Sequence, residues 1–289
     1  MICCSKTFLA LSTIALVIAG MAGAATGSEP EPGLAPPGQW AFSFTPYSWA
    51  TWLKGDQTVR GRTVEVNVNP IELIEDLDTV PFMGYAEARR GPIALYSDVV
   101  YADVGLGRSS VKSGELNPSV SGRLSTSVGL DYQQVIAEVG GAYEIVRGPT
   151  AIDVLAGARY WHQDASIKFA PAADLDVGGL VVSRNRAIAR SGSVDWVDPI
   201  IGARIRHQLA PGESLMLRGD IGGFSAGSQF SWNVVAAYSW ELAVRDGVTY
   251  SGVLGYRLLD VDFEKGSERT KYEFDMLQHG PITGLTIAF

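Results

Sequence analysis

The sequence predicts an all-β fold, a closed antiparallel transmembrane β-barrel of about ten strands, with about eight or twelve as alternatives. Three observations lead to this prediction. Apolar and polar residues alternate with a period of two in long segments that Gly/Pro turns separate. Helical periodicity is almost absent, and no long apolar run follows the N-terminal region. The stretch from Pro281 to Phe289 places bulky and small side chains on opposite faces, as expected of a strand with lipid on one side.

The first residues carry the pattern of a secretory signal peptide. Lys6 gives a basic start, an apolar run follows, and Ala22-Gly23-Ala24 forms an A-x-A site. We expect a signal peptide over 1–24, which holds both cysteines, a Pro/Gly-rich periplasmic linker over 25–38 and the barrel over 39–289. The formal net charge of −8 argues against nucleic-acid binding.

The alternation defines ten wall strands. In chain order we expect them at 39–49, 80–90, 93–106, 123–146, 150–169, 194–209, 214–225, 229–244, 249–263 and 270–289. On one face of these strands stand mainly bulky apolar residues, among them Phe42, Phe82, Leu95, Val154, Tyr160, Ile201, Ile205, Leu217, Trp232, Leu254 and Tyr256. The opposite face carries small or polar residues, so each strand has one face suited to lipid and one suited to a lumen.

Turn lengths give the orientation of the barrel. Short turns occur at 90–92, 147–149, 210–213 and 245–247, with two strands between successive turns, so all lie at one end. The C-terminus lies two strands past the last of them and shares that end. Transmembrane barrels keep short turns and termini in the periplasm, so we expect the polar loops at 107–120 and 170–193 to be extracellular.

The segment 50–79 fits this scheme least well. Residues 58–68 alternate like a strand, whereas 70–78 has the pattern of one or two amphipathic helical turns. Because an even number of strands must precede the turn at 90–92, we interpret the segment as an extracellular hairpin or an inward-folded insertion.

Charged residues fall mainly on the face opposite the bulky apolar ones. A charge facing lipid at mid-membrane would cost roughly 2–4 kcal/mol, so we expect these residues to form a charge network in the lumen. The predicted members are Glu87, Asp98, Glu138, Asp153, Arg159, Asp198, Arg204, Arg206, Arg218, Asp220 and Arg257. Three interpretations remain open: an interlocked ionic core in a narrow barrel filled by side chains, a polar channel or small-solute site, and a catalytic constellation.

Aromatic residues gather toward the strand ends, where membrane barrels carry interfacial girdles. We place in this group Trp40, Trp49, Trp52, Tyr101, Tyr160, Trp161, Trp196, Trp232, Trp240 and Phe289. The three histidines, His162, His207 and His279, are isolated and make no metal-ligand pattern. A rim site of His162 with Asp164 and Ser166 is conceivable, but no motif supports it.

Short motifs in a fixed order resemble those of a loosely defined, largely uncharacterised family of proteobacterial outer-membrane β-barrel proteins. The motifs are F-S-F-T-P-Y-S-W at 42–49, G-Y-A-E-A-R-R-G-P at 84–92, Y-S-D-V-V-Y at 96–101, A-G-A-R-Y-W at 156–161, D-W-V-D-P-I-I-G-A-R at 195–204, L-R-G-D-I-G-G-F at 217–224, G-Y-R-L-L-D-V-D-F at 255–263 and H-G-P-I-T-G-L-T-I-A-F at 279–289. The resemblance spans nearly the whole mature chain. It implies a porin-like barrel in the bacterial outer membrane, and it implies no substrate or catalytic residue.

These observations favour a non-enzymatic protein without a cofactor. We expect it to be structural or to allow passage or binding of small solutes through its charged lumen. The expected surroundings are outer-membrane lipid and lipopolysaccharide. Leu285, Ile287 and Phe289 resemble a C-terminal signal for the barrel-assembly machinery. Two alternatives are a lipid-modifying enzyme at the outer rim and a surface adhesion or assembly protein acting through the long loops.

Overall fold

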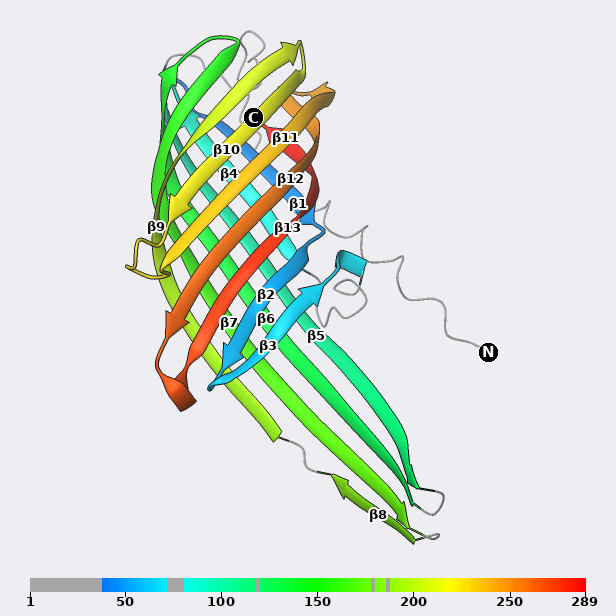
Figure 1. The fold of residues 1–289 in the computed structure, drawn as a ribbon. Helices are drawn as coiled ribbons and strands as arrows, with labels where there is room; N and C mark the ends of the chain where they lie inside the picture. Colours follow the sequence, from blue (N-terminus) through cyan, green and yellow to red (C-terminus); the bar gives the residue numbers. More distant parts are fainter. Residues whose placement is uncertain (1–37, 72–80, 118–119, 178–179, 186–187) are drawn as a thin grey trace.

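A computed structural model describes residues 38–71, 81–117, 120–177, 180–185 and 188–289. The expected signal peptide and all but the last residue of the linker lie outside these ranges. Ten antiparallel strands close the barrel (Figure 1), and β1 pairs with β13 to complete the ring. They are β1 (Ala41–Trp49), β4 (Phe82–Arg90), β5 (Ile93–Asn117), β6 (Val120–Val146), β7 (Thr150–Val177), β9 (Ile188–Ala210), β10 (Glu213–Gly222), β11 (Phe230–Arg245), β12 (Val248–Lys265) and β13 (Tyr272–Ala288). The predicted fold class and strand number are confirmed.

The segment after β1 forms a hairpin of β2 (Trp52–Val59) and β3 (Arg62–Val68). β2 continues the pairing of β1 along β13, from the pair Trp52 with His279 to the pair Val59 with Tyr272. This hairpin accounts for the strand pattern predicted at 58–68. Most of the predicted helical turn at 70–78 lies outside the described residues.

The expected loops at 107–120 and 170–193 are mostly strand, so this prediction was wrong. β5 and β6 stay paired from Ile93 with Tyr143 to Asn117 with Val120, and β7 pairs with β6 out to Val177. β8 (Leu180–Asn185) adds a further strand beside the end of β7. Figure 1 shows these strands as an arm that extends well beyond the ring. Polar composition marks where the sheet leaves lipid, but backbone pairing continues past that point.

The outer surface of the ring is apolar. Leu254 of β12 and Ile201 of β9 are 54% and 56% exposed, and their neighbours along each strand turn inward. Exposed apolar residues recur around the ring, including Phe42, Leu95, Val139, Val154, Val197, Ile205, Leu217 and Leu285. A closed barrel with an apolar outer face and a polar interior is the architecture of a protein that spans the bacterial outer membrane. In the described part of the chain, no helix is long and apolar enough to cross a membrane.

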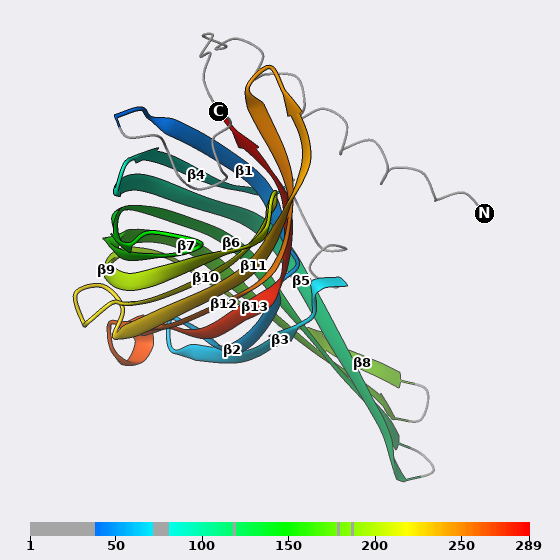
Figure 2. The same cartoon turned by 90° about the horizontal axis from the view of Figure 1, so that it is seen from above.

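The ring has two different ends. Tight turns join β4 to β5, β6 to β7, β9 to β10 and β11 to β12 at the end that also holds both termini of the ring, and we call this the short-turn end. The opposite, long-loop end carries the β2–β3 hairpin and the arm (Figures 1 and 2). The general rule for transmembrane barrels predicts that the short-turn end faces the periplasm.

Candidate functional site

The lumen contains three layers, which the inward-facing residues of β12 show in order. Val253 lines an open cavity near the short-turn end, and Arg257 belongs to a charged layer. Leu259, Val261 and Phe263 are buried in an apolar cluster near the long-loop end. Strand alternation places these residues on the inward face of β12, so this one strand contributes a side chain to each of the three layers.

Six guanidinium groups meet six carboxylates in the charged layer. They are Arg89, Arg159, Arg204, Arg206, Arg218 and Arg257 with Glu87, Asp98, Glu138, Glu144, Asp153 and Asp220. The formal charges of this set balance. A balanced and hydrogen-bonded layer is required because an unpaired charge in the interior costs several kcal/mol.

Asp153 of β7 is the centre of the first cluster. Its carboxylate is fully buried and accepts hydrogen bonds from three arginines. Arg204 donates from Nε at 2.9 Å, Arg89 from Nη2 at 3.1 Å and Arg206 from Nη2 at 3.2 Å. Glu87 and Glu144 complete the cluster by accepting from the same arginines.

Glu138 of β6 and Asp220 of β10 form the second cluster with two arginines. Arg159 lies between them and donates to Glu138 Oε2 at 2.8 Å and to Asp220 Oδ1 at 2.5 Å. Arg218 contacts the other oxygen of each carboxylate. Both acids therefore have their two oxygens occupied, as buried carboxylates require.

Arg257 and Asp98 form the third cluster. Arg257 Nη1 lies 2.8 Å from Asp98 Oδ2 and 3.0 Å from the Tyr47 hydroxyl, which in turn donates to Asp98 Oδ1 at 2.7 Å. Asn233 connects this cluster to the second, because it accepts from Arg257 Nε at 3.1 Å and donates to Asp220 Oδ2 at 2.9 Å.

Ten of the eleven charged residues named from the sequence lie in these clusters. Asp198 also faces inward, but its contacts are neutral. It accepts from the backbone N–H and hydroxyl of Ser228 at 2.7 and 2.9 Å and from Trp196 Nε1 at 3.3 Å, so it holds the loop that follows β10. Sequence reasoning missed Arg89 and Glu144, although Arg89 shares strand parity with Glu87, and Glu144 with Glu138.

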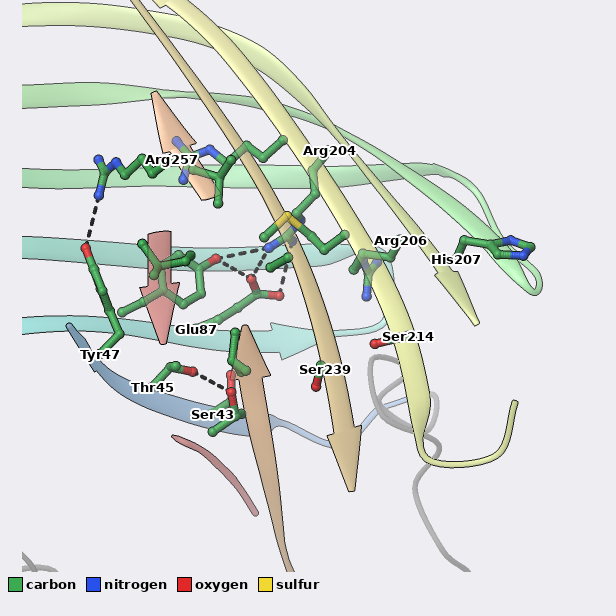
Figure 3. A pocket seen from close by; sticks show the side chains of 18 of the residues that line it. Ser43, Thr45, Tyr47, Glu87, Arg204, Arg206, His207, Ser214, Ser239 and Arg257 are labelled. Atoms are coloured by element: carbon green, nitrogen blue, oxygen red, sulfur yellow. Dashed lines mark hydrogen bonds and ion pairs between the residues drawn. The ribbon is translucent and has the colours of Figure 1, made fainter. Parts of the chain in front are cut away.

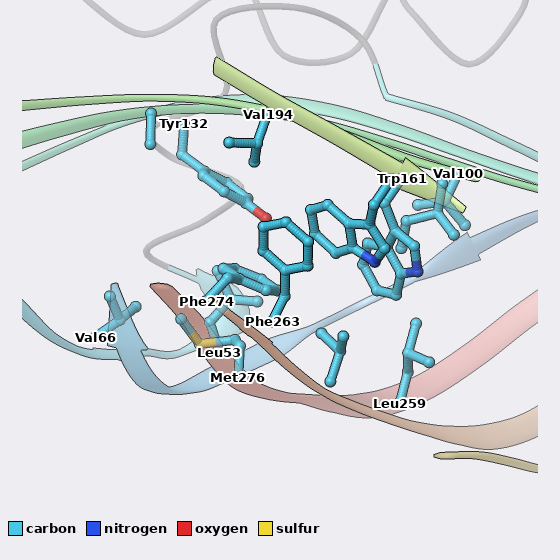
Figure 4. Close-up of a cluster of buried hydrophobic side chains, with 14 of the residues drawn as sticks. Leu53, Val66, Val100, Tyr132, Trp161, Val194, Leu259, Phe263, Phe274 and Met276 are labelled. Atoms are coloured by element: carbon cyan, nitrogen blue, oxygen red, sulfur yellow. The ribbon is translucent and has the colours of Figure 1, made fainter. Parts of the chain in front are cut away.

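Aromatic side chains fill the lumen toward the long-loop end (Figure 4). Trp196 stacks on Phe263 with ring centroids 3.9 Å apart and on Trp161 at 5.4 Å. Four apolar residues of the β2–β3 hairpin, Leu53, Val59, Val66 and Val68, pack against the same cluster. We call this cluster the aromatic plug.

The plug corrects part of the predicted aromatic girdle. Trp49, Trp161 and Trp196 are buried in the lumen instead of lying at the membrane interface. Trp161 shares strand parity with Arg159 and Gln163, so its inward direction follows from the alternation. Its inward direction was overlooked because the whole lumen was assumed to be polar.

An open cavity of about 310 Å³ occupies the lumen on the other side of the charged layer (Figure 3). It reaches Pro149 and Ser214, which lie beside short turns. Small inward-facing residues such as Ser43, Ala237 and Thr286 leave this volume empty. Of the three interpretations left open by the sequence, a lumen filled by side chains describes the charged layer and the long-loop end, whereas the cavity lies toward the short turns.

His279 of β13 and His207 of β9 have different partners, and His207 is also one of the residues that line the cavity. His279 stacks on Trp52 with centroids 5.7 Å apart, and its Nδ1 lies 2.7 Å from the Tyr256 hydroxyl. His207 Nδ1 lies 2.7 Å from the Thr150 hydroxyl near the short-turn end. Among the residues that the structure describes, no group of three or more His, Cys, Asp or Glu side chains is arranged to hold a metal ion.

No known protein-family model matches the sequence, and no curated protein matches it. Several solved structures resemble the fold. The outer membrane protease OmpT from Escherichia coli has a TM-score of 0.44 at 10% identity, with 86% of this chain and 96% of that chain covered. A Pseudomonas aeruginosa FadL homologue has a TM-score of 0.28 at 8% identity, with 86% of this chain and 90% of that chain covered. The CymD monoaromatic hydrocarbon channel has a TM-score of 0.32 at 8% identity, with 88% of each chain covered. These distant likenesses provide no functional residue for this chain.

Proposed function

We propose that this protein is a non-enzymatic outer-membrane barrel that is closed to free diffusion and binds a small solute in its short-turn cavity. The cavity itself carries the proposal. Its volume of about 310 Å³ falls within the range of ligand pockets, and it combines an apolar wall with a few polar groups. Because it reaches the short turns, a solute would enter from the periplasmic side.

Two layers support the closed state. A solute moving past the cavity would have to separate ion pairs such as Arg159 with Asp220, both fully buried. It would then have to displace the stacked rings of Trp196 and Phe263. A buried charge that loses its ion-pair partner costs about 3–5 kcal/mol, so spontaneous opening of the lumen would be rare.

Closure is tested by planar-bilayer recording. The refolded barrel should insert without discrete conductance steps, and insertion is verified by recovering folded protein with heat-modified gel mobility from the same preparation. Reproducible ion-selective steps would contradict closure and would make the charged layer a conducting filter.

Binding is tested with three probes of similar size, octan-1-ol, octanoate and octylamine. Calorimetric titration would use the barrel in lipid nanodiscs, with empty nanodiscs subtracted. Val253→Trp fills the cavity from β12 and Ala237→Leu fills it from β11, whereas Leu254→Trp is a matched control on the lipid-facing side. At least one probe should bind the wild type and the control but not the filled variants. If no probe shows binding that depends on the cavity, the proposed function is wrong.

We also propose that β13 serves as an assembly signal. Leu285 and Phe289 are 37% and 54% exposed on the outer face, where a folding factor could contact them. Phe289 is joined to Phe42 by two backbone hydrogen bonds of 2.8 and 2.9 Å, so this end of β13 also closes the ring.

A further inference from the structure

We infer that the short-turn cavity selects an anionic amphiphile, a molecule with one carboxylate head and a short apolar body. This inference rests on the proposed solute-binding function and specifies its ligand class. The argument begins with the charged groups that line the cavity. They comprise four arginines and two acids, namely Arg204, Arg206, Arg218, Arg257, Glu87 and Asp98.

Two of the four arginines are neutralised at the cavity surface itself. Arg204 Nη1 lies 2.5 Å from Glu87 Oε2, and Arg257 Nη1 lies 2.8 Å from Asp98 Oδ2. All four of these residues line the cavity. A ligand that approaches either pair therefore meets both charges together.

The acids paired with Arg206 and Arg218 do not line the cavity. Arg206 contacts Glu144 and Asp153, and the carboxylates of both acids are at most 1% exposed. Arg206 itself is 18% exposed, the largest value among the six arginines of the charged layer. The cations thus face the cavity, while their counterions lie behind them in the wall.

Arg218 repeats this arrangement on β10. Its partners Glu138 and Asp220 are at most 1% exposed, and its guanidinium lies 4.8 Å from the centroid of the Tyr96 ring. The layer as a whole is balanced, but the surface that it presents to the cavity carries excess positive charge. Such a surface favours a carboxylate over a neutral or cationic head group.

The remaining wall suits an alkyl or similar apolar body. Met216, Val235, Val253 and Ile282 line the side formed by β10 to β13. Glu87 of β4 and Arg204 and Arg206 of β9 contribute charged groups to the same cavity (Figure 3). A carboxylate placed at Arg206 would leave the body of the ligand against this apolar wall, where burial removes apolar surface from water.

The same three probes separate this inference from the proposed function. Octanoate should bind the wild type about tenfold or more tightly than octylamine, with octan-1-ol between them, as expected from one charge-assisted hydrogen bond. Arg206→Gln should reduce octanoate affinity about tenfold and leave octan-1-ol affinity unchanged. A purely structural effect of the substitution would weaken both probes equally.

The wild-type comparison decides the question even where Arg206→Gln fails to fold. Equal affinity for the three probes, or a preference for octylamine, would overturn the anionic selectivity and leave cavity binding intact. Absence of any binding that depends on the cavity would overturn the proposed function, and the ligand class with it.

Discussion

Asp153→Asn tests whether the charged layer stabilises the barrel. The substitution keeps the shape of the side chain and removes the charge that faces Arg89, Arg204 and Arg206. Removing one partner of a buried ion pair costs about 3–5 kcal/mol. Because Glu87 and Glu144 still contact these arginines, we expect the substitution to lower the free energy of unfolding by about 3 kcal/mol, the lower end of this range. A loss of this size shifts the folding equilibrium by more than about a hundredfold.

The assay is reversible urea unfolding of the barrel in lipid vesicles. Tryptophan fluorescence reports the aromatic plug, and heat-modified gel mobility reports the closed barrel. The matched control is Asp131→Asn, which removes the same charge from a pair with Lys168 whose two side chains are 48% and 60% exposed. Exposed pairs contribute about 0–1 kcal/mol, so the control should unfold almost like the wild type. Equal stability of the two variants would refute the reasoning.

A double variant separates charge balance from lost contacts. Arg206→Gln combined with Asp153→Asn removes one positive and one negative charge from the same cluster. We expect the double variant to be less destabilised than the sum of the two single variants, by about 0.5–3 kcal/mol. Additive effects would mean that Asp153 and Arg206 stabilise the barrel independently.

Three further predictions concern single positions. Gly280→Ala should impair refolding, because a Cβ at this position would overlap the backbone oxygen of Ala50 where β1 passes into β2. The yield of heat-modifiable protein measures this. Asp262 lies opposite Asp275 beyond the membrane-spanning part of β12, and burial together with Asp275 raises the pKa of Asp262. A carboxyl with a raised folded-state pKa destabilises the fold above that pKa, so the protection factor of amides near 262, which is the intrinsic exchange rate at each pH divided by the observed rate, should rise as the pH falls from 7 toward 4, and Asp262→Asn should remove this rise. Asp198→Ala should speed amide exchange in the loop after β10 without reducing barrel yield, since Asp198 holds that loop by neutral hydrogen bonds.

The strands and their number could be predicted because the membrane imposes a period of two. A residue such as Leu254 must face lipid and its neighbours Val253 and Gly255 must face the lumen, so alternation reveals both the strand and its direction. The same rule gave no information on where strands end outside the membrane. β5 and β7 continue to Asn117 and Val177 in the arm beyond the ring, where polar residues suit a paired strand as well as a loop.

The contacts inside the lumen could not be predicted from the same pattern. Alternation states that Arg89 and Asp153 both point inward, but not that they meet, because they are separated by 64 residues and lie on strands β4 and β7. Their depth in the lumen depends on the stagger between β4, β5, β6 and β7, which is set by pairings such as Arg89 with Ala94 and Glu144 with Asp153. The stagger also decides which arginines pair with acids that line the cavity and which pair with acids buried behind the cavity surface. The selectivity proposed for the cavity is therefore a property of the closed barrel.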